Sequence, residues 1–163
     1  MKAIVISDTH IPLNARDIPE QLWKQIKASD MIIHAGDIAE EPFYEKLASL
    51  KPIEAVSGNM DSYSLKSRLE VKRVLSIAGK RIGLVHGAGA PYNILDFVKS
   101  EFSSTHNLDA VIYGHSHKPD ITTMDGIVYM NPGSPTDKMF APYNSYILLD
   151  ISEDGLDPHI IRL

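Results

Sequence analysis

The sequence contains no cysteine, and this absence removes two classes of chemistry at once. Without thiols the chain forms neither disulfide bonds nor thiolate metal sites, so any metal would be bound through nitrogen and oxygen atoms. A chain without cysteine also fits a reducing compartment. Its stability must come from an apolar core, and 163 residues are enough for one such domain, spanning residues 1–163.

Long hydrophobic runs are missing as well. The N-terminal stretch MKAIVISDTH has only a short apolar segment before Asp8 and His10, so it does not resemble a signal peptide. No apolar run approaches the roughly 20 residues that a membrane-spanning helix needs. We therefore expect a cytoplasmic protein that does not contact a membrane.

Positive charge is the third feature in short supply. Sixteen lysines and arginines stand against 21 aspartates and glutamates, which gives a net charge of -5. Binding to long nucleic acids usually requires a basic face, so we expect no such partner. The short basic cluster at Lys66, Arg68, Lys72 and Arg73 is interpreted as a solvated strand or loop, although a few of its cations could line a phosphate pocket. A homo-oligomer is left open.

The first third of the sequence alternates short apolar runs with amphipathic segments. Runs rich in β-branched residues predict buried strands within 2–7, 31–37 and 52–59, and apolar residues at helical spacing predict helices at 18–29 and 40–50. Strands that alternate with helices in this way predict a parallel sheet with right-handed crossovers.

The remainder of the chain is dominated by hairpins. Residues 70–87, 120–131 and 144–163 each contain two strand-like runs around a turn sequence, which is AGK, DG or EDG. A helix is predicted at 91–104 and a buried strand at 109–114. Three prolines mark a loop between the last two hairpins. Together these elements predict a mixed α/β fold without repeats or linkers.

Metal-competent side chains follow the ends of five of the apolar runs. In parallel α/β sheets the carboxyl ends of the strands form the ligand crevice, so side chains far apart in sequence can meet there. Glycines flank several of these positions, which permits sharp turns and close packing. The stretches are SDTH with Asp8 and His10, AGD with Asp37, SGNMD with Asn59 and Asp61, VHG with His86, and YGHSH with His115 and His117.

The spacing of His115 and His117 suggests why two imidazoles stand one residue apart. Residues i and i+2 of an extended segment point the same way, roughly 6.5–7 Å apart at the backbone. Two rings placed like this could reach two ions about 3.5–4 Å apart, one ring for each ion. Asp8 and His10 form the same kind of pair. The nitrogen and oxygen ligands favour manganese, iron, nickel, cobalt or zinc over calcium.

The order of these motifs resembles that of a known family. D-x-H, GD, GN-x-D, HG and GH-x-H occur in this order between residues 8 and 117, which is similar to the motif order of calcineurin-like metallophosphoesterases. The NPGSP stretch at 131–135 resembles a loop of the small stand-alone microbial phosphodiesterase branch. The resemblance implies a four-layer α/β/β/α sandwich with two mixed β-sheets.

The resemblance also implies two divalent transition-metal ions per chain, with manganese as the first choice. The first ion would be held by Asp8, His10, Asp37 and His117. The second would share Asp37 with the first and be completed by Asn59, His86 and His115. The residues by themselves predict only the placement at strand ends and the pairing of side chains.

The implied activity is hydrolysis of a small phosphodiester by a metal-bridging hydroxide. Asn59 is expected to stabilise charge on the phosphoryl oxygens, and Asp61 to orient a metal-bound imidazole through a hydrogen bond. Many family members carry a histidine after GN that protonates the leaving group, but this chain has Met60 there. A thioether donates no proton, so the source of that proton is unassigned and poor leaving groups should react slowly.

Competing interpretations stay open for several of these residues. His86 follows GLV and could be a satisfied core histidine, and Asp37 could cap the helix that follows it. His34 lies inside a predicted strand and is interpreted as structural or as a support for the ligands. Asn131 and Ser134 either line the pocket or shape a turn, and the turn is favoured.

Other functions stay open as well. The same site would serve a phosphomonoesterase or a nucleotide pyrophosphohydrolase, and only a panel of substrates separates these from a phosphodiesterase. A non-catalytic scaffold is an alternative from another class, because the superfamily includes a retromer subunit that serves in protein assembly. All seven candidate ligands are present in this chain, which favours an enzyme.

Overall fold

The computed structural model describes residues 1–163 and arranges the strands in two mixed sheets. The first sheet has five strands in the order β10-β9-β1-β2-β3. Strands β1, β2 and β3 are parallel, β9 is antiparallel to β1, and β10 is antiparallel to β9. The bounds are Lys2–Ile6 for β1, Met31–His34 for β2, Ile53–Ala55 for β3, Ser145–Ile151 for β9 and Leu156–Arg162 for β10.

The second sheet also has five strands, in the order β4-β5-β6-β8-β7. Its three central strands β5, β6 and β8 are parallel, and the hairpin partners β4 and β7 run antiparallel at the two edges. The bounds are Lys72–Ile77 for β4, Lys80–Val85 for β5, Ala110–Ile112 for β6, Asp120–Met124 for β7 and Ile127–Asn131 for β8.

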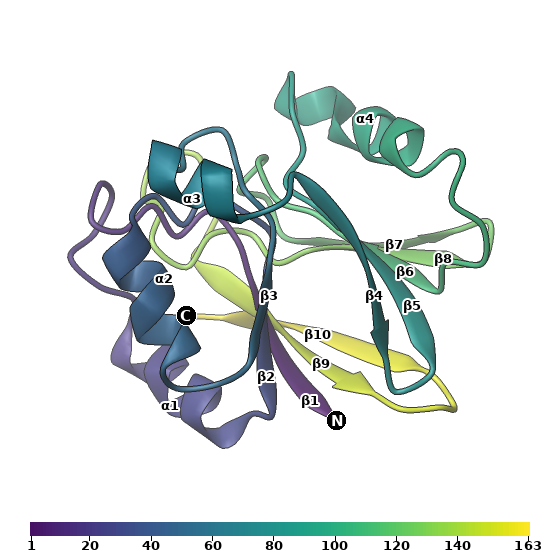
Figure 1. The fold of residues 1–163 in the computed structure, drawn as a ribbon, viewed down its shortest axis with the longest axis horizontal. Coiled ribbons are helices and arrows are strands. Elements are labelled where there is room, and N and C mark those ends of the chain that lie inside the picture. Colours follow the sequence, from purple (N-terminus) through teal and green to yellow (C-terminus); the bar gives the residue numbers. More distant parts are fainter.

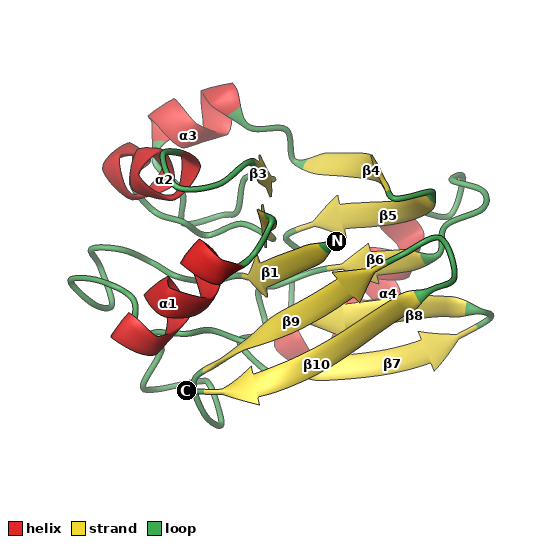
Figure 2. Cartoon of the chain, turned by 90° about the horizontal axis from the view of Figure 1, so that it is seen from below, coloured by secondary structure: helices red, strands yellow, loops and turns green.

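Helices cover the outer face of each sheet, as Figures 1 and 2 show. Helices α1 and α2 pack on the first sheet, and α4 packs on the second. The bounds are Glu20–Ala28 for α1, Glu41–Ala48 for α2, Tyr63–Arg68 for α3 and Ile94–Glu101 for α4, which is preceded by a 3-10 turn at Pro91–Asn93.

Alternation along the strands separates three apolar clusters. In β1, Ala3 and Val5 face the second sheet, whereas Ile4 and Ile6 pack under the helices. A strand buried on both faces must be apolar at every position, which is the pattern that the sequence shows. The layers are therefore helix, sheet, sheet and helix, and the predicted four-layer α/β/β/α sandwich is confirmed.

The secondary structure of the basic cluster differs in part from the predicted strand or loop. Lys66 and Arg68 lie on the short helix α3, which the sequence analysis did not predict, whereas Lys72 begins β4. Helix α3 has only six residues and one buried side chain, Leu65, so its apolar periodicity is too short to detect. Arg68 forms ion pairs with two glutamates of α2, and Lys72 with Glu101, so much of this charge is balanced within the chain.

No helix of the chain combines the length and the apolar character that crossing a membrane requires.

The parallel strands of both sheets direct their carboxyl ends toward one end of the sandwich, where the loops that follow them meet.

Candidate metal centre

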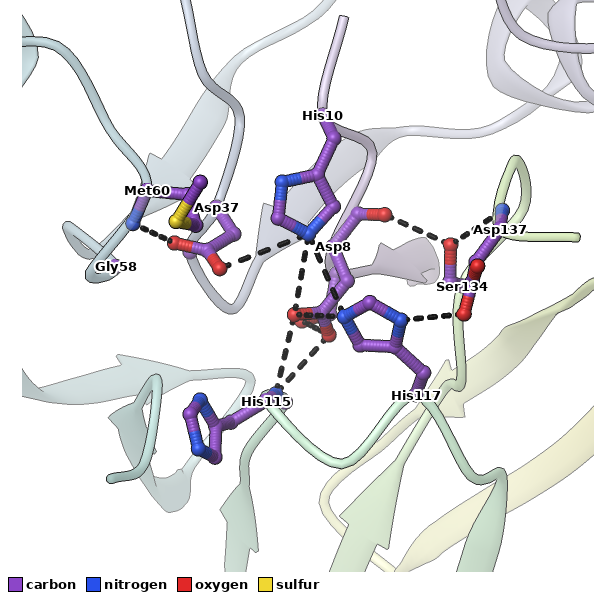
Figure 3. A network of polar contacts seen from close by, with 12 residues as sticks. Asp8, His10, Asp37, Gly58, Met60, His115, His117, Ser134 and Asp137 are labelled. Atoms are coloured by element: carbon purple, nitrogen blue, oxygen red, sulfur yellow. Dashed lines mark hydrogen bonds and ion pairs between the residues drawn. The ribbon is translucent and has the colours of Figure 1, made fainter. Parts of the chain in front are cut away.

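The seven predicted ligands lie in loops that follow the parallel strands of both sheets. These loops meet at one place, and Figure 3 shows the side chains of Asp8, His10, Asp37 and His117 directed toward one another. The ligands are Asp8 and His10 after β1, Asp37 after β2, Asn59 after β3, His86 after β5, and His115 and His117 after β6.

Five of these residues form two groups with metal-ligand spacing. Asp8, His10 and His117 each offer one atom within 4.8 Å of the others, and so do Asp8, Asp37 and His86. In the first group, Asp8 Oδ1 lies 3.3 Å from His117 Nε2 and 4.0 Å from His10 Nε2. Separations of this size are expected for ligands around one ion, because two donor atoms about 2.1 Å from an ion lie about 3 Å apart.

Asp8 belongs to both groups, whereas the resemblance implied Asp37 as the shared carboxylate. Asp8 Oδ1 also lies 3.8 Å from His86 Nε2. Asp37 Oδ2 lies 3.2 Å from His86 Nε2 and 3.6 Å from His10 Nε2. Both carboxylates therefore lie between the two groups, and either has the position of a bridging ligand.

The other two predicted ligands, Asn59 and His115, contact each other beside the second group. His115 Nδ1 lies 3.1 Å from Asn59 Oδ1, and the His115 ring packs edge-on against His86 with 5.3 Å between ring centroids. His117 instead packs against His10, also at 5.3 Å. The two neighbouring imidazoles thus approach different groups, although the Nε2 of His115 is bonded to the carbonyl of Gly89.

The hydrogen bonding of His86 fits a metal ligand better than a satisfied core histidine. Its Nδ1–H donates to the carbonyl of Ala35 over 2.7 Å, which leaves Nε2 as the atom facing the carboxylates. This buried Nε2 forms no well-aligned hydrogen bond, although Asp37 Oδ2 lies 3.2 Å away. Buried polar atoms are rarely left without one, so a cation between Nε2, Asp8 and Asp37 would resolve the exception.

His117 is oriented by Asp137, a residue that was not among the predicted site residues. Its Nδ1–H donates to Asp137 Oδ2 over 2.6 Å, which turns Nε2 toward Asp8. A carboxylate behind a histidine ligand sets its tautomer and increases its basicity. Asp137 follows the NPGSP stretch by two residues, and nothing local marks it, because its role depends on packing that brings residues 117 and 137 together.

Asp137 also organises the loop that follows it. Its carboxylate accepts hydrogen bonds from the backbone N–H groups of Met139, Phe140 and Ala141 over 2.8–3.0 Å. These bonds and the contact with His117 lower its pKa against the effect of partial burial. One carboxylate therefore joins a candidate ligand to the conformation of residues 138–141.

The charges at the site are strongly coupled. Burial alone would raise the pKa of Asp8, but His117, His86 and Ser7 outweigh burial and lower it to about 2. Burial opposes protonation of His86 and His117, yet the neighbouring carboxylates raise the pKa of each to about 9. The buried carboxylates at this site require adjacent positive charge. Protonated imidazoles provide it in the metal-free protein, and a bound cation would take their place.

The backbone of the ligand loops is not extended, contrary to the prediction from the sequence. The pairs 8/10 and 115/117 were expected to share a side because residues i and i+2 do so in a strand. Five ligands have left-handed backbone instead, with φ of 54° at Asp8, 44° at His10, 56° at Asp37, 68° at His115 and 56° at His117. Such conformations cost about 1–3 kcal/mol each and concentrate at functional sites.

Asp61 does not contact an imidazole, contrary to expectation. Its carboxylate accepts hydrogen bonds from the backbone N–H groups of Ala39 and Gly58, each over 2.7 Å. These bonds join the loop after Asp37 to the loop that carries Asn59. Asp61 therefore supports backbone geometry, and the carboxylate that orients an imidazole is Asp137.

Asn131 and Ser134 shape the NPGSP loop and also hold the ligand loops. Asn131 Oδ1 accepts from the Gly133 N–H, and its Nδ2 donates to the carbonyl of Gly114. Ser134 Oγ donates to the carbonyl of Asp8 over 2.7 Å. The predicted turn is thus present, and it fixes the backbone next to His115 and Asp8.

His34 is a structural histidine beneath the loops that carry the candidate ligands. It is fully buried, its Nδ1 accepts from the Gly36 N–H, and its Nε2 therefore donates to Thr9 Oγ1 over 3.0 Å. Burial lowers its pKa to about 3, so the folded protein keeps this ring neutral.

His34→Gln should make the metal-free protein less sensitive to acid. The pKa of His34 is lower in the folded state than the unfolded value of about 6.5, so the unfolded chain binds the proton first and stability falls as pH decreases below 6.5. Between pH 7 and pH 5, His34 lowers the free energy of unfolding by about 2 kcal/mol. Glutamine binds no proton, so the variant should not show this loss. Urea unfolding of both proteins in chelator at the two pH values measures the difference, and equal losses would show that His34 is not the responsible group.

Buried carboxylates and imidazoles within ligand distance of one another form a candidate metal-binding site. The calcineurin-like phosphoesterase superfamily domain matches residues 1–154, and the chain belongs to this family. A probable metallophosphoesterase of Methanothermobacter thermautotrophicus is 37% identical over 163 residues, which cover 97% of this chain and 90% of the relative.

Two solved structures share the fold at lower identity. Vps29 from Chaetomium thermophilum superposes with a TM-score of 0.81 at 22% identity and covers 100% of this chain and 97% of its own. An archaeal phosphodiesterase superposes with a TM-score of 0.74 at 22% identity and covers 99% of this chain and 100% of its own. At this identity the likeness establishes the fold alone.

Proposed function

We propose that this chain is a metal-dependent phosphodiesterase with a dinuclear centre. The observation that carries the proposal is the pair of ligand groups that share Asp8, in which the buried Nε2 of His86 faces Asp8 and Asp37 without a well-aligned hydrogen bond. Two groups of buried nitrogen and oxygen donors suit two divalent transition metals, of which manganese remains the first choice. Such ions, when bound, make coordinated water acidic and neutralise charge on phosphoryl oxygens.

The charges of the chain favour an anionic substrate once cations are present. Two divalent ions would bring four positive charges against the two carboxylates Asp8 and Asp37 and one hydroxide. Lys118 is exposed at the same cavity, and its amine has no hydrogen-bond or ion-pair partner. Asn59 lines this cavity as well, so its amide can stabilise a phosphoryl oxygen while its contact with His115 positions it.

Met60 determines which esters should react. It lies beside Asp37, to which its backbone N–H donates over 2.7 Å, and its side chain borders the cavity (Figure 3). A thioether provides no proton for a departing oxygen. We therefore assign diesters with acidic leaving groups to this site, and we expect alkyl phosphomonoesters to react slowly.

An aryl phosphodiester should be hydrolysed only with added transition metal, and chelator should abolish the reaction. An alkyl phosphomonoester should react at least about 100-fold more slowly, because a positioned general acid contributes about 10²–10⁴-fold. Steady-state kinetics with manganese, nickel, iron, cobalt and zinc, together with elemental analysis of the purified protein, measure both effects.

Met60→His tests the explanation of that preference. The substitution places an imidazole at the cavity, and it should accelerate the alkyl ester more than the aryl diester. Comparable rates of the unsubstituted protein on both esters would contradict the diester assignment and favour a phosphomonoesterase or a nucleotide pyrophosphohydrolase on the same site.

A protein-assembly scaffold is the competing function. Fold likeness does not decide between the two, because Vps29 and the archaeal phosphodiesterase are equally identical to this chain. The side chains favour an enzyme, because a scaffold has no need of strained, buried ligands held in shape by Asp137, Asn131 and Ser134. Absence of metal-stimulated turnover on every ester would support the scaffold.

A further inference from the structure

Four large apolar side chains are exposed around the candidate metal centre. They line a cavity of about 760 Å³ that also contains His10, Asp37, His115 and His117. We call these four residues the apolar rim; they are Leu13, Met60, Met139 and Phe140, with exposed fractions of 60%, 52%, 79% and 67%. Scattered apolar residues on a surface need no explanation, but four around one polar cavity do.

The backbone of each rim residue is fixed to the metal centre. Met60 N–H donates to Asp37, and the N–H groups of Met139 and Phe140 donate to Asp137. Leu13 lies in a turn closed by a hydrogen bond of 2.8 Å from the Asn14 N–H to the carbonyl of His10. The backbone at or beside each rim residue is therefore fixed by the groups that shape the ligands, which places the four side chains around the cavity.

The Phe140 side chain packs against one of the candidate ligands, His117. Its ring packs edge-on against His117, with 6.2 Å between ring centroids and an interplanar angle of 74°. Phe140 and His117 line the same cavity, so the ring borders the space that an ester group at the candidate ligands would occupy. Lys118 borders the same cavity and provides the positive charge that a phosphoryl group requires.

We propose that the apolar rim binds a planar aromatic group on one arm of the phosphoester, the class to which nucleobases belong. This inference rests on the proposed function, since it deepens the same site. Aromatic rings favour edge-to-face contact with Phe140, and thioethers such as those of Met60 and Met139 make favourable contacts with ring edges. An aliphatic arm of equal size would gain burial but not these contacts.

Binding of three phosphonates to the manganese-loaded protein tests the inference without turnover. Phenylphosphonate, cyclohexylphosphonate and methylphosphonate share the phosphonate group and differ in the attached arm. Calorimetry should show phenylphosphonate binding about tenfold more tightly than methylphosphonate, the ratio expected when about 55 Å² of apolar surface leaves water. Cyclohexylphosphonate should bind more weakly than phenylphosphonate.

The double variant Met139→Ala/Phe140→Ala should bring the ratio of phenyl to methyl affinity to about twofold or less. Both side chains are exposed, so folding should not suffer, and the manganese content of the variant verifies that the centre is intact. Tyr63→Ala is the matched control, because Tyr63 is 89% exposed outside the cavity. Its phenyl-to-methyl ratio should equal that of the unsubstituted protein.

The outcomes separate this inference from the proposed function. Equal affinity for phenyl- and methylphosphonate, or a cyclohexyl arm that binds as well as phenyl, would overturn the aromatic assignment even if diesters are hydrolysed. Failure of all three phosphonates to bind would overturn it as well. The expected ratios without any turnover would support the rim as a binding site and refute the phosphodiesterase.

Discussion

Asp8→Asn should abolish nearly all turnover while leaving the fold intact. Asp8 is the one carboxylate that belongs to both ligand groups, and its pKa of about 2 keeps it ionised at every working pH. Asparagine retains an oxygen that can accept the His115 N–H but removes the negative charge that the two ligand groups share. Because metal activation supplies several kcal/mol, kcat/KM on an aryl diester should fall about 10³–10⁴-fold.

The readout should include metal content as well as activity. Elemental analysis should find less manganese bound to Asp8→Asn, and circular dichroism should find the fold unchanged. Asp150→Asn is the matched control, because this exposed carboxylate on β9 has no hydrogen-bond or ion-pair partner. Turnover of Asp8→Asn within tenfold of the unsubstituted protein, at equal metal content, would refute the shared-ligand assignment.

Most strands and helices follow from local patterns in the sequence. Buried strands such as β1 and β6 are apolar on both faces, and hairpins such as β7–β8 carry a DG turn, so neither depends on distant residues for its detection. The pairing of the strands into two sheets does not follow from these patterns. It came from the resemblance to a family, and the structure confirms it.

The candidate ligands could be located, but their local geometry could not. Aspartate and histidine at strand ends mark the site in the sequence, because the carboxyl ends of parallel strands converge. Left-handed backbone at residues such as His115 and His117 leaves no such mark, since glycine is the usual signal for it. Hydrogen bonds from distant residues accompany these conformations, for example the bond from His115 N–H to Asp8.

Supporting residues were the least predictable part of the site. Asp137 orients His117 across 20 residues, and Asp61 joins two loops through backbone amides, so each role depends on tertiary packing. Carboxylates in loops are common, and most serve as turn or cap residues. Interpreting Asp61 as the partner of an imidazole therefore assigned the right kind of role to the wrong carboxylate.

Gly114→Ala should inactivate the candidate metal centre although it substitutes none of the candidate ligands. A Cβ atom at Gly114 would lie 1.8 Å from Ser7 Oγ and 2.9 Å from Asp8 Oδ2, so the loops after β1 and β6 must move apart. The Gly114 backbone cannot yield easily, because its N–H donates to the carbonyl of His86 and its own carbonyl accepts from Asn131. Overpacking of this kind costs about 1–3 kcal/mol of stability.

The displacement separates Asp8 from His115, so kcat/KM should fall about 10²–10³-fold. A misplacement of about 1 Å in a catalytic group already lowers the rate about 10²-fold. Ser7→Ala combined with Gly114→Ala should recover part of the loss, since it removes the Oγ atom at 1.8 Å. Gly155→Ala is the control, because its Cβ would meet no atom within 4 Å. Full activity and metal content in Gly114→Ala would show that the approach of these two loops does not determine the geometry of the centre.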